Sequence, residues 1–394
     1  MGTQAIFTGE IPVRNSSLYD KAWILLIFFA AACASFNGFN DKWDFYTAPQ
    51  HTVYPYVARF DAMIDGTAPR PYIYRQLIPS IANLTDHIVP SSAKVWLVSP
   101  RQGKPSRLSF LTNTSIAQDD HYSFRFLVLY LTTFGFVLFS LYAMLLVCRE
   151  LGFSLAASVL APVVLILLLP FLMNKGGYFY DYSELAFFAL SAWVALRFEW
   201  WYLIPIAALA TWNKESYLLF VLALYPMLRQ RYSRRDSAVG IGVLSLVCVA
   251  VYTVLRSRYG MNPGGTVESH WNEQLHYFLD IRHIVFSEEK TYGMVGTSSC
   301  TIVPLLLLGW TFIHSWRRLP AVMRDHAKIA AIINVPLFLL FCAPGELRDL
   351  SLLYVTLLIA MATTMNAWTT SDTVPGKISE RADTPDCAST RARA

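Results

Sequence analysis

Long apolar runs separated by short polar connections dominate the chain. A helix needs about 20 apolar residues to cross the hydrocarbon core of a bilayer, and several of these runs approach that length. The runs are Ala22–Phe39, Phe126–Cys148, Phe153–Met173, Tyr182–Phe198, Trp200–Trp212, Tyr217–Leu228, Ala238–Leu255, Thr301–Trp316, Ile329–Ala343 and Leu352–Trp368. The pattern predicts an all-α fold, a polytopic transmembrane helical bundle of about ten spans.

The stretch Trp200–Leu228 is apolar except at its middle, where Asn213, Lys214, Glu215 and Ser216 follow one another. A single helix over this stretch would run about 43 Å and bury these polar groups near the centre of the bilayer. Two short segments that meet at a polar turn avoid this, because such breaks are tolerated where they are buried in protein or line a cavity. We therefore predict a hairpin.

Basic residues follow a one-sided pattern along the connections. With the N-terminus in the cytoplasm, three cations fall on short outer connections, namely Lys175, Lys214 and Arg348. The cations on the inner connections are Arg149, Arg197, Arg229, Arg231, Arg234, Arg235, Arg317, Arg318, Arg324 and Lys328. The positive-inside rule then predicts that both termini are cytoplasmic.

Two long connections lie on the outer side in this topology, about residues 40–125 and 256–300. The first contains Tyr56–Ile64 and Arg75–Ile88, and the second contains His270–Phe286. These three segments have the apolar spacing of helices that lie at a membrane interface. We predict one transmembrane domain over residues 1–368 and a disordered cytoplasmic tail over residues 369–394, which is rich in Pro, Ser, Thr and charged residues.

Composition narrows the functional classes. Of 394 residues, 55% are hydrophobic and 15% are charged, whereas a soluble domain carries about 25% charged residues. The net charge of +5 is explained by the inner connections, so nucleic acid is not an expected partner. The sequence contains no HExxH, GxSxG or P-loop motif, and its six cysteines form no CxxC pair. Zinc protease, serine hydrolase and ATPase functions therefore lack their core groups, and we assign no metal site.

Acidic residues near the apolar runs gather on the outer side. Asp41 and Asp44 follow the first span, and Asp181 and Glu184 share one helical face at the start of the fourth. Glu215 lies in the break of the hairpin, and Glu346 and Asp349 join the last two spans. The cations among them are Arg75, Lys175, Lys214 and Arg348.

Two interpretations of this charged set stay open. Carboxylates in a cleft of low dielectric can act as general bases, and Arg and Lys can bind phosphate oxygens. Alternatively, the charges are solvated in loops or pair with one another, as Glu346 with Arg348 and Asp41 with Lys42. Tyr178, Tyr180, Tyr182 and Trp43 belong either to interfacial aromatic belts or to a surface that stacks on sugar rings.

The layout resembles the GT-C superfamily of membrane glycosyltransferases. The likeness rests on the acidic segment Phe39-Asn40-Asp41-Lys42-Trp43-Asp44 after the first span, on Arg75 within Tyr74–Pro79, and on Glu346-Leu347-Arg348-Asp349 near the end. It implies transfer of a sugar from a polyprenyl-phosphate donor to an extracytoplasmic glycan or lipid-linked acceptor, with inversion. It also implies a multi-pass protein of a bacterial inner membrane that acts in cell-envelope polysaccharide biosynthesis.

The resemblance gives each candidate residue a role. Asp44 or Asp41 would be the catalytic base, and Arg75, Lys214 and Arg348 would bind the donor phosphate. Asp181, Glu184, Glu215, Glu346 and His270 would support the site. No cofactor is assigned, and a divalent cation held by Asp and Glu side chains is left open. The alternatives are a transporter or flippase for a lipid-linked or anionic substrate, and another lipid-dependent enzyme such as a ligase, polymerase or acyltransferase.

Overall fold

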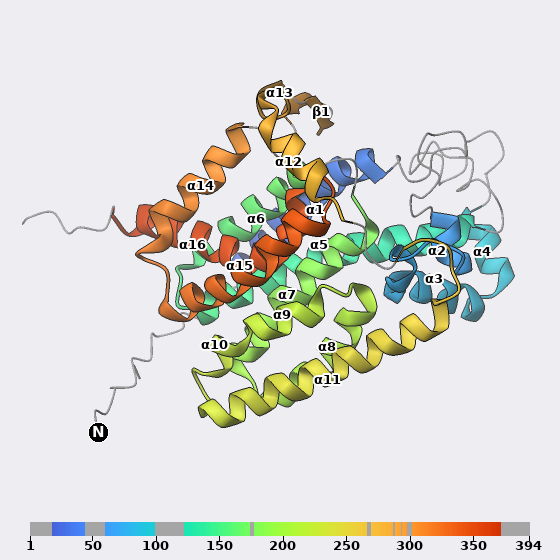
Figure 1. The fold of residues 1–394 in the computed structure, drawn as a ribbon, viewed down its shortest axis with the longest axis horizontal. Coiled ribbons are helices and arrows are strands. Elements are labelled where there is room, and N and C mark those ends of the chain that lie inside the picture. Colours follow the sequence, from blue (N-terminus) through green and yellow to red (C-terminus); the bar gives the residue numbers. More distant parts are fainter. Residues whose placement is uncertain are drawn as a thin grey trace, which may run out of the picture.

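The fold is a bundle of long helices, and the short helices of residues 60–98 lie together at one end of it (Figure 1). The computed structural model describes residues 18–43, 60–98, 122–173, 177–265, 269–286, 288–292, 294–297 and 302–371. The longer helices are α1 (Leu18–Trp43), α5 (Ser123–Glu150), α6 (Leu155–Leu172), α7 (Phe179–Arg197), α8 (Leu203–Asn213), α11 (Arg234–Tyr259), α14 (Ile302–Trp316), α15 (Ala321–Phe341) and α16 (Tyr354–Ser371).

Shorter elements connect these helices. The first outer connection contains α2 (Phe60–Asp65), η2 (Tyr72–Tyr74), α3 (Leu77–Ile88) and α4 (Ser91–Val98). The others are η4 (Trp200–Tyr202), α9 (Tyr217–Ala223), α10 (Tyr225–Leu228), α12 (Trp271–Leu279), α13 (Ile281–Phe286), the strands β1 (Glu288–Thr291) and β2 (Met294–Thr297), and η5 (Leu347–Leu353). The two strands form an antiparallel hairpin, which the sequence pattern did not predict.

Within the described residues, five helical segments are long and apolar enough to cross a membrane. They are Leu18–Phe39, Ser123–Glu150, Leu155–Leu172, Arg234–Tyr259 and Leu347–Thr369. The helical fold is therefore confirmed, and these apolar helices suggest a membrane protein, whereas the count of about ten spans and the orientation stay predictions. The predicted tail begins within α16, which continues to Ser371, and residues 372–394 lie outside the described part.

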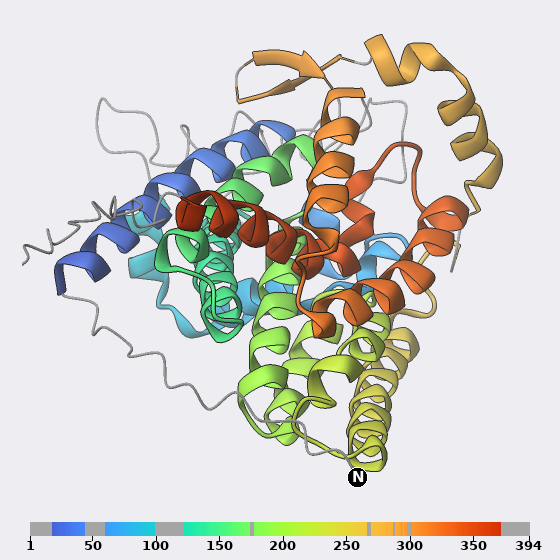
Figure 2. The same ribbon diagram turned by 90° about the vertical axis from the view of Figure 1, so that its left-hand side faces the viewer.

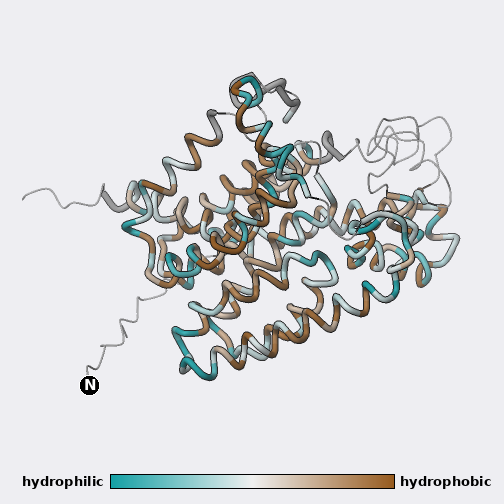
Figure 3. Tube along the Cα trace, in the orientation of Figure 1, coloured by the Kyte–Doolittle hydropathy of each residue, from teal (hydrophilic) through white to brown (hydrophobic). Residues whose placement is uncertain are grey.

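Apolar side chains cover the outside of the long helices as well as their core. Leu246 and Val254 on α11, and Leu306 and Ile313 on α14, are all more than half exposed. Figure 3 shows apolar residues along most of the bundle and polar residues at the connections. A water-soluble bundle would present polar residues on these faces, so the exposed apolar surface is what a lipid environment requires.

The stretch Trp200–Leu228 forms the predicted hairpin. α8 ends at Asn213, α9 begins at Tyr217, and Lys214 between them has extended backbone geometry. An ion pair of 3.4 Å joins Arg231, after α10, to Glu199, before η4, so the two ends of the stretch meet. The polar residues 214–216 consequently lie at the opposite end of the hairpin.

The two ends of the bundle contain different connections (Figures 1 and 2). At one end Arg197 pairs with Glu150 and Arg231 pairs with Glu199. At the other end α2, α3 and α4 pack beside the start of α5, where Arg125 pairs with Asp86 of α3. Helix α7 runs between the two ends through the core, packed against α5, α8 and α16, and nearly all of its side chains are buried. Its first turn therefore lies among the connections that the sequence predicts to be outer.

The interfacial segments predicted from the sequence are largely helical. Arg75–Ile88 contains α3, and the described part of Tyr56–Ile64 begins α2. His270–Phe286 is divided at Asp280 into α12 and α13. The polar segment after Pro90 contains α4, which was not predicted, because its short run of apolar residues has no clear helical period.

Candidate functional site

Four segments that are distant in sequence bring charged side chains together at the end of α7. They are the segment after η2, the first turn of α7, the break between α8 and α9, and the loop into η5. We call the charged residues that meet there the charged cluster. Its members are Arg75, Asp181, Glu184, Lys214, Glu215, Glu346, Arg348 and Asp349.

The first turn of α7 fixes two carboxylates on one face. The Asp181 carboxylate accepts a hydrogen bond of 2.9 Å from the backbone N–H of Tyr178, in a capping arrangement at the helix N-terminus. A carboxylate is favoured at this end by the helix dipole. Glu184 lies one turn later on the same face, as its spacing of three residues requires.

Lys214 is the centre of the charged cluster. Its Nζ lies 2.7 Å from Glu184 Oε2, 3.6 Å from Asp181 Oδ1 and 3.9 Å from Asp349 Oδ1. Its side chain is only 9% exposed. Burial alone would lower the pKa of Lys214, but the surrounding carboxylates override burial and raise it. Lys214 is therefore held in its charged form.

Arg75 approaches the charged cluster from the first outer connection. Its guanidinium makes a two-pronged contact with Glu215, with Nη2–Oε1 at 2.6 Å and Nε–Oε2 at 3.1 Å. Nη1 donates to the hydroxyl of Tyr180. Burial of Glu215 opposes its ionisation, but the neighbouring Arg75 outweighs burial and lowers the pKa of Glu215. This charge-assisted pair ties α3 to the break between α8 and α9.

Arg348 closes the charged cluster from the loop into η5. Its Nη1 lies 3.2 Å from Asp181 Oδ2, and its Nη2 lies 3.0 Å from Glu346 Oε2. The pairing of Glu346 with Arg348 that the sequence suggested is present in the structure. Arg348 also pairs across the chain with Asp181, so the contact is more than a local loop interaction.

Tyrosine rings line the cationic side of the charged cluster. Tyr178 stacks on Tyr180 with ring centroids 5.0 Å apart, and Tyr72 stacks on Tyr178 at 5.7 Å. Arg348 lies 4.4 Å from the centroid of Tyr178, and Arg75 lies 4.7 Å from that of Tyr180. These distances are those of cation–π contacts, which help to hold the cations in place.

Hydroxyl groups complete the surroundings of Glu184. Ser351 donates to Glu184 Oε1 at 2.8 Å, and Ser216 donates to the same oxygen. Glu184 thus has Lys214 on one oxygen and two hydroxyls on the other, and its side chain is 3% exposed. Such a fully paired carboxylate orients its neighbours.

The charged cluster has more carboxylates than cations. Three cations face five carboxylates, which gives a formal charge of −2. Burial raises the pKa of Glu346 to about 7, against the opposing effect of Arg348. Near neutral pH this carboxyl exchanges a proton readily, and the protonated form weakens its hold on Arg348. Among the described residues, no group of three His, Cys, Asp or Glu side chains is arranged to hold a metal ion.

The structure brings most of the candidates from the sequence into contact. Arg75, Lys214, Arg348, Asp181, Glu184, Glu215 and Glu346 all belong to the charged cluster. His270 instead begins α12, where its ring lies 2.6 Å from Glu273. The side chain of Asp41 and the whole of Asp44 lie outside the described residues. Phe39, two residues before Asp41, has its ring 5.1 Å from that of Tyr182, so α1 ends beside the start of α7.

Asp349, Ser216 and Ser351 were not among the predicted site residues. Asp349 had a signal in the sequence, since it lies three residues after Glu346 in the same polar interruption. Ser216 and Ser351 had none, because a serine near a helix end is common. Tyr182 is also separate from the cationic face, since its hydroxyl is buried against Ser35 of α1 at 2.8 Å.

Comparison with protein-family models, with curated proteins and with solved structures finds no match for this chain. The chemistry of the charged cluster must therefore be argued from its own geometry.

Proposed function

We propose that the protein is a membrane glycosyltransferase that moves a sugar from a polyprenyl-phosphate donor to a glycan or lipid-linked acceptor, with inversion. The observation that carries the proposal is the buried convergence of Arg75, Lys214 and Arg348 at one end of an apolar bundle. A buried ion-pair network contributes less to stability than well-packed apolar residues of the same volume. Ionisable groups near a membrane interior are by default functional candidates.

The three cations suit the leaving group of this reaction. A polyprenyl phosphate enters from the bilayer, so its phosphate arrives near the ends of the spanning helices. Arg75 and Arg348 offer planar forks that match phosphate oxygens, and Lys214 offers a point charge. Their carboxylate partners keep them charged and oriented before the donor binds, which is the arrangement that electrostatic catalysis needs.

The charged cluster carries a net negative charge that repels a phosphate, so binding of the donor phosphate would require Glu346 to take up a proton. A protonated Glu346 leaves one edge of the Arg348 guanidinium available and removes one negative charge from the charged cluster. The donor phosphate would then replace Glu346 as the partner of Arg348. In this proposal Glu346 is the carboxyl that the donor phosphate displaces from Arg348, and it is not the catalytic base.

The base would be Asp44 or Asp41, at the end of α1. The acceptor hydroxyl gives its proton to this carboxylate as its oxygen attacks the anomeric carbon. The bond between the anomeric carbon and the phosphate oxygen breaks, and its electron pair leaves with the polyprenyl phosphate. One displacement of this kind inverts the anomeric centre. No step in this scheme requires a metal ion, and the scheme assigns no residue to one.

The test uses the full chain in lipid nanodiscs, supplied with polyprenyl-phosphate donors that carry a radiolabelled hexose or pentose and with a membrane glycolipid extract as acceptor. We expect a labelled product together with release of polyprenyl phosphate. Lys214→Met and the Asp41→Asn, Asp44→Asn double variant should abolish both, whereas Lys328→Met, which changes an exposed pair with Asp325, should not. Full transfer by the double variant would refute the assignment of the base, and full transfer by Lys214→Met would refute the role of the charged cluster.

A transporter or flippase is the second candidate, and the break between α8 and α9 favours it. Interrupted helices with polar groups at the break often form substrate sites in transporters. In proteoliposomes a transporter would show counterflow of a labelled lipid-linked sugar with no release of polyprenyl phosphate. That result would replace the proposed enzyme with a carrier.

A further inference from the structure

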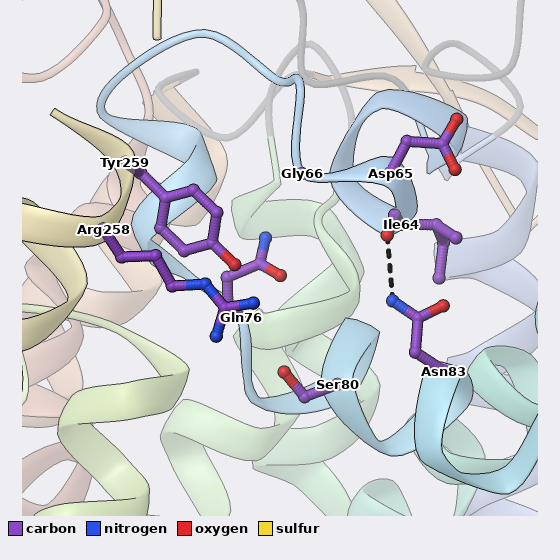
Figure 4. A pocket seen from close by; sticks show the side chains of 8 residues that line it. All are labelled: Ile64, Asp65, Gly66, Gln76, Ser80, Asn83, Arg258 and Tyr259. Atoms are coloured by element: carbon purple, nitrogen blue, oxygen red, sulfur yellow. Dashed lines mark hydrogen bonds between the residues drawn. The ribbon is translucent and has the colours of Figure 1, made fainter. Parts of the chain in front are cut away.

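A polar pocket lies beside the charged cluster, between α2, α3 and the end of α11 (Figure 4). Its volume is about 410 Å³. The residues that line it are Ile64, Asp65, Gly66, Gln76, Ser80, Asn83, Arg258 and Tyr259. Pockets for small molecules begin at about 300 Å³, so the cavity is large enough for a ligand rather than for single waters.

The walls of this pocket are held by contacts between distant segments. Asn83 Nδ2 donates to the carbonyl of Ile64 at 2.9 Å, which joins α3 to α2. Asn262, just after α11, donates to the carbonyls of Gly66 and Ala68, both at 2.9 Å. Gly66 has a φ of +74°, a conformation that a residue with a Cβ rarely adopts. The pocket is therefore bounded by fixed backbone on the α2 side.

The chemistry of the lining mixes donors and acceptors. Figure 4 shows the Arg258 guanidinium and the Tyr259 hydroxyl directed toward Gln76, with Ser80 and Asn83 opposite. Arg258 forms no ion pair with an acidic side chain in the described part of the chain, and its guanidinium lies 5.3 Å from the centroid of the Tyr259 ring. The carboxylate of Asp65 points away from these groups and accepts a hydrogen bond from the hydroxyl of Tyr122. Hydroxyl, amide and guanidinium groups around one cavity match a ligand that both donates and accepts hydrogen bonds at many positions.

We propose that this pocket binds a saccharide unit of the acceptor, away from its reacting end. Each sugar hydroxyl both donates and accepts, as the lining requires. The ring of Tyr259 adds an apolar surface to the lining. An inorganic anion fits the lining less well, because it offers no donor to the amide oxygens of Gln76 and Asn83. The acceptor role rests on the proposed glycosyltransferase function, whereas saccharide binding itself does not.

The chain links this pocket to the charged cluster directly. Arg75 contributes to the charged cluster, and the next residue, Gln76, lines the pocket. The backbone N–H of Gln76 donates to the carbonyl of Trp212 at 3.1 Å, two residues before Lys214. A saccharide that contacts Gln76 therefore holds the segment that also positions Arg75. Occupancy of the pocket would place the acceptor chain beside the donor phosphate.

Binding is tested by saturation-transfer NMR on the full chain in phosphatidylcholine nanodiscs, which avoid detergents with sugar headgroups. The probes are disaccharides and trisaccharides of glucose, galactose, mannose, N-acetylglucosamine and arabinose. We expect at least one probe to bind, and Ser80→Phe and Arg258→Gln to weaken it at least tenfold. Arg235→Gln, an exposed change at the opposite end of α11, is the matched control and should bind normally.

The outcomes separate this inference from the proposed function. Lys214→Met should lose sugar transfer and keep saccharide binding, because Lys214 does not line the pocket. In an active preparation, Arg258→Gln should raise the KM for the acceptor at least tenfold and leave the KM for the donor unchanged. The inference is overturned if no probe binds, if Arg258→Gln binds as tightly as the parent, or if inorganic phosphate binds the pocket and no sugar does. Because Arg258 is exposed, its replacement tests the inference even if Ser80→Phe fails to fold.

Discussion

The two ends of the bundle contain the same types of charged residue, but these are buried at one end and exposed at the other. At the end with the charged cluster, Lys214 is 9% exposed and faces carboxylates on three sides. At the other end, Lys328 is 60% exposed and pairs with Asp325, which is equally exposed. Water screens the second pair but has little access to the first. The comparison shows that charged side chains are buried and shared among several partners at one end, and are exposed and paired singly at the other.

The largest expected difference in stability between the two ends comes from replacing one lysine at each end by methionine. Lys214→Met removes the cation that Asp181, Glu184 and Asp349 share and leaves only Arg348 beside Asp181, so we expect a loss of about 3–5 kcal/mol of stability and complete loss of activity. Lys328→Met removes one exposed pair and should cost less than about 1 kcal/mol. Thermal unfolding in nanodiscs measures both. Equal shifts for the two variants would show that the charged cluster is as hydrated as the surface.

The second-largest effect on stability and activity is expected from a change in the geometry of the Arg75 side chain. Arg75→Lys keeps the charge but loses the two-pronged contact with Glu215, which should lower stability by about 1–3 kcal/mol and activity at least tenfold. Arg197→Lys changes an exposed pair with Glu150 at the opposite end and serves as the control. If Arg75→Lys behaves as its control does, the fork of Arg75 is not needed for the site.

The pKa of Glu346, about 7, predicts that the stability of the fold decreases as the pH rises. A carboxyl whose pKa is raised in the folded state stabilises the fold below its ordinary pKa near 4.5, and this contribution is lost as the pH rises through about 7. Glu346→Gln removes the titration. We therefore expect the unfolding temperature of the variant, relative to the parent, to rise from pH 5 to pH 8. A constant difference across this range would mean that Glu346 is already ionised at pH 5.

The smallest effect belongs to the exposed arginines. Arg231→Gln should change stability by less than about 0.5 kcal/mol, since its pair with Glu199 spans 3.4 Å and both side chains are about a third exposed. Activity in purified protein should be unchanged. Replacing these arginines should instead affect the orientation of the protein in the membrane, because fewer cations on the predicted inner connections weaken the positive-inside bias. A cysteine-labelling assay of topology in intact cells would detect it once several of these arginines are replaced together.

Local patterns predicted the fold class and most of the candidate residues. The apolar runs predicted the long helices because a helix in lipid must satisfy its own backbone hydrogen bonds. The polar residues 213–216 predicted the hairpin for the same reason. The i, i+3 spacing of Asp181 and Glu184 placed both on one face of α7, since that spacing is a property of the helix itself.

Other features depended on contacts that no local pattern contains. The short strands at residues 288–297 and the helix α4 have weak periodicity and form in a tertiary setting. His270 was grouped with the charged residues because it lies in an outer connection, yet it pairs with its neighbour Glu273. The pocket could not be predicted, because two of its lining residues, Asn83 and Arg258, are more than 170 positions apart in the sequence.

The sequence alone determined the helical fold and the long apolar runs that suggest a membrane protein, together with charged residues that are few and unevenly distributed. These properties follow from the free energy of apolar burial and of backbone hydrogen bonding, which act within a single segment. Only the tertiary structure decided that Arg75, Lys214 and Arg348 meet the same group of carboxylates. The physical reason is that a partner for a buried charge can come from any segment that packs nearby, and packing joins α3, α7, α9 and η5 across the length of the chain.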